Sequence, residues 1–516
     1  MSIEAGFGKV DVTRFEPGMP MLGWGVFECV AMGAARPLFA RALVLRRGGR
    51  ALAYVVVDLC FVSAALRVAV LDALEARGLP LSPCDVMLTA THTHAGPNGF
   101  SHAFLYDLSA LGFSRRVFDG LVEGVAGAIA EGFARLQPAR LGLGRADVRG
   151  DVARNRSPAA YANDPDATGD GVDRELLALR VDDAGGRPLG AVSFFALHAT
   201  SIHAETRRLH PDHKGLAAAG FEAFLGPDAV ALFAQGAAGD VSPNVRWDRE
   251  RGVMVGARGD DEASAAYVAD AQVDATRRAW LDATPIDGPL DARAAHVDLE
   301  ERFVPAAYAG GAPARTTRGR LGIAMAAGTA EGPGPLAGLP LPRRSWSADP
   351  KVTLLDVGPD ARRRLLGALD PGRLRLPGAV FAHVARSRGL ERAWIPTVLP
   401  VQLMRIGDVA IAALPNEPTT QVGRRLRARL ERALGVRRVH VQGYANAYSG
   451  YLTTPEEYRA QRYEGAYTLF GPHTLGAYAQ VLDELAAGLR GEPTEIEGPP
   501  LPTCTDEELA SRAFGR

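Results

Sequence analysis

Short apolar runs alternate with amphipathic helical patterns near the start of the chain, and this order restricts the fold more than any other feature. Strand-like runs lie near 41–47, 51–62 and 85–91, and the helical pattern AALRVAVLDALEARG occupies 64–78. Strands that alternate with helices are typical of α/β folds. The sequence therefore predicts an α/β protein.

Two later segments each predict a β-hairpin. Residues 175–201 and 401–415 both contain two apolar strands joined by a glycine-containing turn. Hairpins pair antiparallel strands, so we expect mixed rather than purely parallel sheets, flanked by helices. After the second hairpin, the spacing of apolar residues predicts a helix over 419–435 with a terminal glycine, and 437–444 predicts one more strand.

Charge and cysteine content exclude several classes of protein. The 516 residues include 58 basic and 59 acidic side chains, a net charge of −1, so no general positive field would attract nucleic acid. The four cysteines are scattered without a CxxC pair: Cys29, Cys60, Cys84 and Cys504. We therefore expect reduced, buried thiols rather than a disulfide scaffold or a thiolate zinc site.

From the sequence we expect neither an export signal nor a membrane span. Its N-terminus lacks the basic start and apolar core of a secretory signal. Asp58, Arg67 and Asp72 interrupt the most apolar long segment, which is too polar for a transmembrane helix. We expect a cytoplasmic protein, whose oligomeric state the sequence does not indicate. Residues 310–350, rich in Gly, Pro and Ala, predict either an interdomain linker or a long ordered surface loop.

Histidines stand at the ends of two predicted buried strands. In TATHTHAGPNG, His92 and His94 lie two positions apart, so both imidazoles would share one face if the strand continued through them. His198 ends another apolar strand in AVSFFALHATS. Each histidine can equally be a hydrogen-bonded residue that ends a core strand. Taken together, they can hold a metal ion.

Further candidates follow other strands. Glu417, after the apolar run in AIAALPNEPTT, is either a ligand or an acidic residue that interacts with the dipole of the next helix. Ser242, in LFAQGAAGDVSPN, lies either beside a ligand or in an ordinary turn. For each single tyrosine between Tyr444 and Tyr478, packing is an adequate explanation. Because α/β proteins often have their sites past the carboxyl ends of strands, we expect these residues to share one site. Two imidazoles and a carboxylate are a common ligand set for zinc.

Together these motifs resemble those of the neutral ceramidase family, zinc-dependent amidases that hydrolyse the N-acyl bond of ceramide to a fatty acid and a sphingoid base. The resemblance spans residues 5–490 and rests on motifs in the family's order: THTHAGP, NRSPAAY, FALHATS, KGLAAAGFE, GDVSPN, NEPTTQVGRRLR and YSGYLTTPEEYRAQRYEGAYTLFGPHTLGAY. It implies a catalytic domain over 1–490. The tail over 491–516 is too short for the C-terminal immunoglobulin-like domain that many members carry.

The resemblance also implies roles for individual residues. The implied zinc ligands are His92, His198, Glu417 and Tyr451. The implied catalytic residues around the metal and the scissile amide are Ser242, His94, Arg156 and Tyr463. The implied substrate is ceramide or another N-acyl amine, a small lipid amide, with zinc as the cofactor and no nucleic-acid partner.

The implied ligands suggest a mechanism, with alternatives. Zinc would polarise the amide carbonyl and lower the pKa of its water toward about 7. Since the sequence shows no separate Ser-His-Asp arrangement to activate Ser242, we favour attack by zinc-activated water over an acylated serine. Two other hypotheses are a metal-independent serine hydrolase that uses Ser242 and a non-catalytic lipid- or metabolite-binding homologue.

Overall fold

The computed structural model describes residues 2–334, 336–338, 349–359, 361, 378–492 and 498–515. Its largest sheet has nine strands in the order β11-β10-β9-β7-β1-β3-β4-β5, with β15 paired to β7. The strands are β1 Glu4–Asp11, β3 Phe39–Arg47, β4 Arg50–Val57, β5 Val86–Ala90, β7 Gln137–Asp147, β9 Glu175–Asp183, β10 Pro188–Phe194, β11 Val230–Ala234 and β15 Thr284–Ile286.

Local sequence explains how the first part of this sheet forms. Gly48 and Gly49 both have positive φ, 60° and 84°, which suits the two-residue turn between antiparallel β3 and β4. Strand β4 then crosses to parallel β5 through α1 (Ala64–Ala76), whose N-cap Ser63 accepts a hydrogen bond from the Leu66 amide. The predicted strands and helix of this region are therefore confirmed.

A second sheet has four strands in the order β16-β21-β22-β24: β16 Leu290–Asp298, β21 Val398–Ile406, β22 Val409–Ala413 and β24 Arg438–Gln442. The predicted hairpin turns at Gly407, whose φ is 62°. From β22 the chain returns to parallel β24 through α9 (Thr420–Leu434), which begins after N-cap Thr419 and ends at left-handed Gly435. The mixed sheets predicted from the sequence are confirmed.

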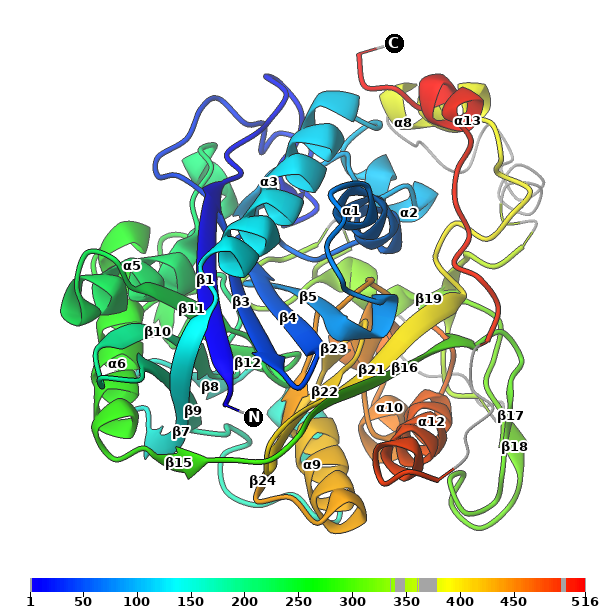
Figure 1. The fold of residues 1–516 in the computed structure, drawn as a ribbon. Helices are drawn as coiled ribbons and strands as arrows, with labels where there is room; N and C mark the ends of the chain where they lie inside the picture. The colour runs from blue at the N-terminus through cyan, green and yellow to red at the C-terminus, as the bar shows by residue number, and fades with distance from the viewer. Residues whose placement is uncertain are drawn as a thin grey trace.

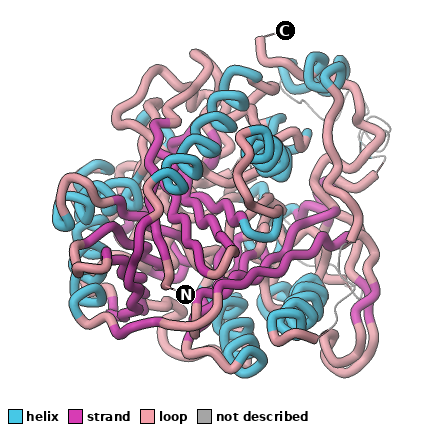
Figure 2. The backbone as a smooth tube through the Cα atoms, in the orientation of Figure 1, coloured by secondary structure: helices cyan, strands magenta, loops and turns pink. Residues whose placement is uncertain are grey.

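Helices cover the outer faces of both sheets (Figures 1 and 2). Helix α3 (Arg115–Ala134) packs on β1 and β3, and α1 packs against α3. Helix α5 (Asp212–Leu225) packs on β10 and β11, and α6 (Asp261–Leu281) packs on β7 and β9. Helices α9 and α12 (Thr474–Leu489) flank the second sheet. Between the sheets, one apolar cluster joins side chains of both, including Leu43, Phe194, Met404 and Ile411.

Short elements connect these layers and shape the loops between them. The short strands are β2 Leu22–Gly23, β6 Ala95–Gly96, β8 Arg154–Asn155, β12 Val241–Ser242, β13 Arg246–Asp248, β14 Val253–Val255, β17 Phe303–Val304, β18 Ala314–Arg315, β19 Arg320–Gly322, β20 Thr353–Asp356, β23 Glu417–Pro418 and β25 Tyr451–Leu452. The short helices are α2 Phe104–Leu108, α4 Pro158–Tyr161, α8 Gly378–Arg386, α10 Pro455–Arg459, α11 Tyr463–Ala466 and α13 Asp506–Ser511. Parts of the segments 310–350 and 491–516, namely 335, 339–348, 493–497 and 516, lie outside the described residues.

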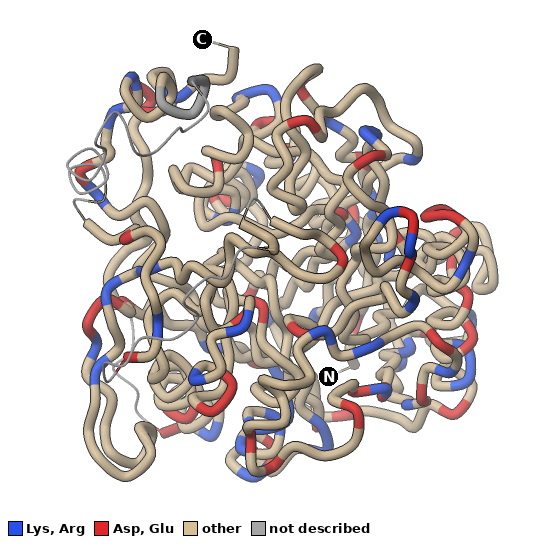
Figure 3. Tube along the Cα trace, turned by 180° about the vertical axis from the view of Figure 1, so that it is seen from behind, with Lys and Arg blue, Asp and Glu red and all other residues tan. Residues whose placement is uncertain are grey.

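Thiols, charges and helix lengths complete the description. All four cysteines are free, but only Cys29 and Cys60 are buried; Cys84, in the short 3-10 helix Pro83–Asp85, and Cys504, just before α13, are half-buried. Acidic and basic residues are interspersed along the chain when the molecule is seen from behind (Figure 3). In the part of the chain that the structure describes, every helix is too short or too polar to cross a lipid bilayer.

Candidate metal centre

The structure brings the four predicted ligand residues together past the carboxyl ends of four strands. His92 follows β5 and His198 follows β10, both in the nine-stranded sheet. Glu417 follows β22 and Tyr451 follows β24, both in the second sheet, and their short strands β23 and β25 pair with Glu417 opposite Tyr451. All four side chains are buried. The site therefore joins the two sheets at their edges.

The donor atoms of three of these residues form a small triangle. Nε2 of His92 lies 3.1 Å from Nε2 of His198, and Oε2 of Glu417 lies 3.2 Å from the first and 3.1 Å from the second. Ligand atoms about 2.0–2.1 Å from a tetrahedral zinc lie about 3.3–3.4 Å apart. The triangle therefore has nearly the size that a zinc ion requires.

Backbone carbonyls fix which imidazole nitrogens face the centre. Nδ1 of His92 lies 2.6 Å from the Cys60 carbonyl oxygen, and Nδ1 of His198 lies 2.7 Å from that of Ala238. A carbonyl only accepts, so each Nδ1 carries a hydrogen and each neutral ring presents a lone pair at Nε2. This arrangement, with the second ring nitrogen bonded to protein, is typical of metal-binding histidines.

Three acceptors facing one another need a positive charge between them. Burial by itself lowers the pKa of His92, but the carboxylate of Glu417 and the thiol of Cys60 raise it to about 10. Burial and the nearby Arg156 cation keep the pKa of His198 below its usual value. A single proton can serve only one pair of the three atoms, whereas a metal ion can bind all three. The donor set therefore fits a divalent metal.

Two tyrosines orient the carboxylate of Glu417. The Tyr448 hydroxyl donates to Oε1 at 2.5 Å, and the Tyr444 hydroxyl donates to Oε2 at 3.3 Å. Tyr448 leaves Oε2 to face the imidazoles. Packing alone is therefore an incomplete explanation for these two tyrosines. Glu417 itself precedes the N-cap of α9, and its side chain turns to the histidines instead of capping the helix.

Tyr451 lies at the fourth position beside the triangle. Its hydroxyl is 3.4 Å from Nε2 of His198, and its ring is nearly parallel to that imidazole. Nη2 of Arg156 donates to the same hydroxyl at 2.8 Å. Burial raises the pKa of Tyr451 well above its usual value, and the Arg156 cation opposes that rise. The hydroxyl oxygen thus faces the centre while a cation supports its phenolate form.

Arg156 is held on all sides by protein groups. Its Nε donates to Glu464 at 2.9 Å, its Nη1 to Glu331 at 3.0 Å, and its Nη2 also to the Gly239 carbonyl at 2.8 Å. Burial lowers its pKa, but the neighbouring Tyr451, Glu464 and Glu331 keep that pKa well above its usual value. With most donors engaged, the guanidinium positions Tyr451 more directly than it reaches a substrate.

Ser242 lies near the centre, but its hydroxyl faces a carboxylate rather than a histidine. Its Oγ donates to Oε2 of Glu331 and accepts from the Asn244 amide at 3.0 Å. Burial alone would raise the pKa of Glu331, yet the Arg156 cation and the Ser242 hydrogen bond lower it to about 2. So weak a base removes a serine proton poorly. This environment holds the hydroxyl in place without activating it.

His94 and Tyr463 lie on the remaining side of the centre. The strand does not continue through the two histidines as expected, because β5 ends at Ala90 and His92 has a left-handed φ of 66°. Nε2 of His94 nevertheless lies 3.2 Å from Nε2 of His92. The ring of Trp24 packs edge-on against His94. Tyr463 packs edge-on against Tyr451, and its hydroxyl has no described hydrogen bond. Both side chains are half-buried and can meet a substrate.

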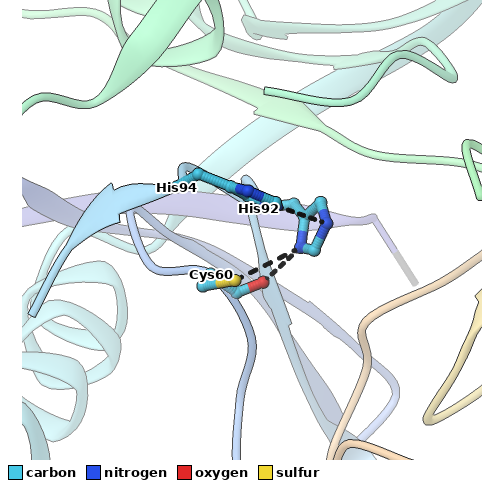
Figure 4. Close-up of side chains that lie close together, drawn as sticks. All are labelled: Cys60, His92 and His94. Carbon is cyan, nitrogen blue, oxygen red and sulfur yellow. Dashed lines mark hydrogen bonds between the residues drawn. The ribbon is translucent and has the colours of Figure 1, made fainter. Parts of the chain in front are cut away.

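Cys60, His92 and His94 also lie close together, but they do not form a second metal site (Figure 4). The Cys60 thiol is 3.7 Å from Nδ1 of His92, the nitrogen that already bonds the Cys60 carbonyl. Burial also raises the pKa of the thiol. The group with Glu417 is therefore the better ligand set.

Sequence reasoning missed two buried carboxylates of this site, Glu331 and Glu464. Glu331 lies in the Gly- and Pro-rich segment, and its bonded partners Ser242 and Arg156 are 89 and 175 residues away. Glu464 stands beside Tyr463 in α11 and also accepts a hydrogen bond from Ser157 at 2.6 Å. A signal existed only for Glu464, which lies within the quoted tyrosine-rich motif.

Comparisons with known proteins find relatives over nearly the whole chain. Residues 3–480 match the family described as neutral/alkaline non-lysosomal ceramidase, N-terminal. The neutral ceramidase of Pseudomonas aeruginosa is 34% identical over 99% of this chain and 77% of its own length; that of Mycobacterium tuberculosis is 33% identical over 97% and 79%. A solved structure titled "Ceramidase complexed with C2" is similar with a TM-score of 0.83 and 32% identity, over 98% of this chain and 77% of that one.

Proposed function

Because this chain belongs to the neutral/alkaline non-lysosomal ceramidase family, we propose that it hydrolyses the N-acyl bond of ceramide or a related lipid amide to a fatty acid and an amine. The observation that carries the proposal is the convergence of His92, His198, Glu417 and Tyr451 on one buried point. These residues come from both sheets, so chance proximity within one loop does not explain their meeting.

We propose zinc as the metal, held by His92, His198, Glu417 and Tyr451. Bound there, zinc would act as a Lewis acid toward the amide carbonyl and lower the pKa of a water toward about 7. The protein supplies orientation: the Cys60 and Ala238 carbonyls set the histidine tautomers, and Tyr448 sets the carboxylate. Arg156 holds the Tyr451 hydroxyl.

His94 and Tyr463 are the groups placed to act on the substrate. Both lie beside the donor triangle: Nε2 of His94 is 3.2 Å from Nε2 of His92, and Tyr463 packs edge-on against Tyr451 with no described hydrogen bond at its hydroxyl. We assign them to donating hydrogen bonds to the developing oxyanion or a proton to the leaving amine. We assign Ser242 to holding the substrate rather than to nucleophilic attack, because its bonded partner Glu331 is too weak a base to activate it.

The test compares hydrolysis and metal content in the same variants. Ceramides, N-acyl amino acids and other N-acyl amines are incubated with wild type and with Glu417→Ala, and the products are identified by mass spectrometry. We expect fatty acid release by wild type, and loss of both activity and bound zinc in Glu417→Ala and His198→Ala. A folded wild type that binds zinc and hydrolyses none of these amides would contradict the substrate class.

Chelation separates this mechanism from a serine hydrolase. If water attacks with metal assistance, exhaustive chelation abolishes activity and readdition of zinc restores it. Ser242→Ala should then lower the rate without abolishing metal binding, and no acyl-enzyme should be detected by intact mass measurement during turnover. Activity that survives chelation but is lost in Ser242→Ala would overturn the metal mechanism.

A further inference from the structure

A cavity of about 420 Å³ lies next to the metal centre, and none of the four proposed ligands is among the described residues that line it. Its size is within the range of pockets that bind small molecules, about 300–1,000 Å³. Phe61, Phe104, Ile395 and Val398 form much of its wall. The cavity therefore suits an apolar group.

Arg512, which also lines the cavity, is a buried cation with no anionic partner at hydrogen-bond distance among the described residues. Only 3% of its surface is exposed. Its described hydrogen bonds go to the carbonyls of His102 and Arg388 and to the thiol of Cys504, at 2.7–3.6 Å, which are all uncharged acceptors.

The carboxylates nearest to Arg512 in the C-terminal helix are engaged elsewhere. Glu507 pairs with Arg388, and Glu508 pairs with Arg392. Asp107 acts on Arg512 only at longer range, and burial raises the pKa of that carboxyl to about 7. A buried charge that is not paired is costly, so an anion in the cavity would be stabilised.

Two further side chains of the lining carry buried polar atoms without a hydrogen bond in the described part of the chain. The Tyr106 hydroxyl is buried without a hydrogen bond among the described residues, although the Gly450 amide lies near it outside bonding geometry. Both ring nitrogens of His102 are also buried and unbonded. These atoms are enclosed by protein, so binding of an anionic group in the cavity would fall to Arg512. On the solvent side, the exposed Glu391 and Arg392 contribute one charge of each sign.

We propose that this cavity binds a fatty acid, with its carboxylate accepting hydrogen bonds from Arg512 and its chain lying against Phe61 and Phe104. One anionic head on an apolar chain satisfies the unpaired guanidinium and the apolar wall together. The assignment rests on the cavity alone. A fatty acid is also the acid product of the reaction proposed above, so the enzyme would bind its product at a second place.

The cavity and the metal centre share one wall. The Phe61 ring stacks on Tyr448 with centroids 4.3 Å apart and planes 7° apart, and both residues line the cavity. On its other side, the Tyr448 hydroxyl donates to Glu417. A bound chain would therefore touch the ring pair that orients a proposed zinc ligand.

Calorimetric titration of the zinc-loaded 516-residue protein with dodecanoate tests the proposal. We expect one binding event that persists in His198→Ala, which separates it from carboxylate binding to the metal. Arg512→Met keeps the length of the side chain but removes its charge, and should weaken this event at least tenfold, about the value of one charge-assisted hydrogen bond. The matched control, Arg388→Met, changes an exposed arginine nearby and should leave the affinity unchanged.

Two further measurements keep the proposal testable if Arg512→Met does not fold. Ala65→Leu adds volume to the cavity wall and should weaken dodecanoate binding, and octanoate should bind more weakly than dodecanoate because each methylene contributes. Methyl dodecanoate, without the charge, should bind at least tenfold more weakly. Dodecanoate binding that is absent in wild type, or that is equal in wild type and Ala65→Leu, would overturn the proposal.

Discussion

At the scale of single residues, the metal centre depends on hydrogen bonds that hold its ligands. Each imidazole is fixed by a backbone carbonyl, which no substitution of a neighbouring side chain removes. The carboxylate of Glu417 is fixed by a side chain, Tyr448, which can be changed. Substitution of Tyr448 is therefore the most direct way to test the hydrogen bonds that hold the proposed ligands.

Tyr448→Phe should weaken zinc binding by about 10- to 100-fold, the usual effect of losing a hydrogen bond to a metal ligand. The phenyl ring keeps the stacking on Phe61, so folding should be little affected. Competition with a fluorescent chelator would measure the affinity. Tyr106→Phe is the matched control, because it removes a neighbouring hydroxyl that has no described hydrogen bond. Equal zinc affinity in both variants would show that Tyr448 does not orient Glu417.

Asp107 should make stability depend on pH. It is buried, Oδ1 accepts from the Ser101 amide at 2.9 Å, and Oδ2 has no hydrogen bond to any residue that the structure describes. Burial raises its pKa from 3.8 to about 7, so the folded protein binds a proton that the unfolded chain releases between these values. This contribution to stability is complete below pH 4, is lost as the pH rises to 7, and amounts to on the order of 4 kcal/mol.

Asp107→Asn tests this dependence, since the amide is uncharged at every pH. Thermal unfolding of both proteins should show the variant gaining on wild type between pH 4 and pH 7, with a constant difference above that range. Parallel curves over the whole range would mean that Asp107 ionises as freely in the folded protein as in the unfolded chain.

At the scale of elements, loops rather than strands bring the ligands close together. The loop after β11 reaches Gly239, whose amide donates to the Pro418 carbonyl at 2.8 Å. A Cβ at Gly239 would lie 2.6 Å from the carbonyl oxygen of Glu417 and 3.0 Å from that of Pro418. The absence of a side chain at this position lets the two loops meet beside a proposed ligand.

Gly239→Ala should therefore displace Glu417 and lower activity by about a hundredfold, as expected for a misplacement of about 1 Å in a catalytic site. Steady-state hydrolysis and zinc content would be measured together. Gly259→Ala is the matched control, because a Cβ there meets no atom within 4 Å. Normal zinc content and activity in Gly239→Ala would show that the two loops tolerate separation.

The elements with local signals were predictable from the sequence. The hairpin at Gly407 and helix α9 follow from turn residues, caps and apolar spacing within fewer than twenty residues. His198 and Glu417 were predictable as residues at strand ends. Glu331 was not, because its segment has no periodicity and its partners are distant in sequence. The half-exposure of Cys84 and Cys504 likewise depends on tertiary packing rather than on local pattern.

At the scale of the whole molecule, the proposed zinc would connect two sheets. His92 and His198 come from the nine-stranded sheet, and Glu417 and Tyr451 from the four-stranded one. The apolar cluster between the sheets already joins them, so the ion adds to an existing interface. A ligand that binds only the folded state stabilises it by mass action.

Zinc should accordingly raise the stability of the 516-residue protein. At a free concentration of 100 times the dissociation constant, the gain is about 2.7 kcal/mol. Differential scanning calorimetry of chelated and zinc-loaded protein would show the higher midpoint in the loaded form. The unfolding midpoint of His198→Ala should not rise on zinc loading, although it should still shift when a substitution elsewhere in the chain changes stability. An unchanged midpoint on loading would argue against a single ion shared by both sheets.

The wide separation of the four ligands along the chain has a consequence for biosynthesis. A ribosome releases His92 early, but Tyr451 leaves it only after most of the protein has been made. A nascent polypeptide can therefore collect zinc only loosely until its last ligand emerges and both sheets have closed. We expect tight loading to be a final step of maturation, so that premature termination before Tyr451 yields a chain unable to retain the ion.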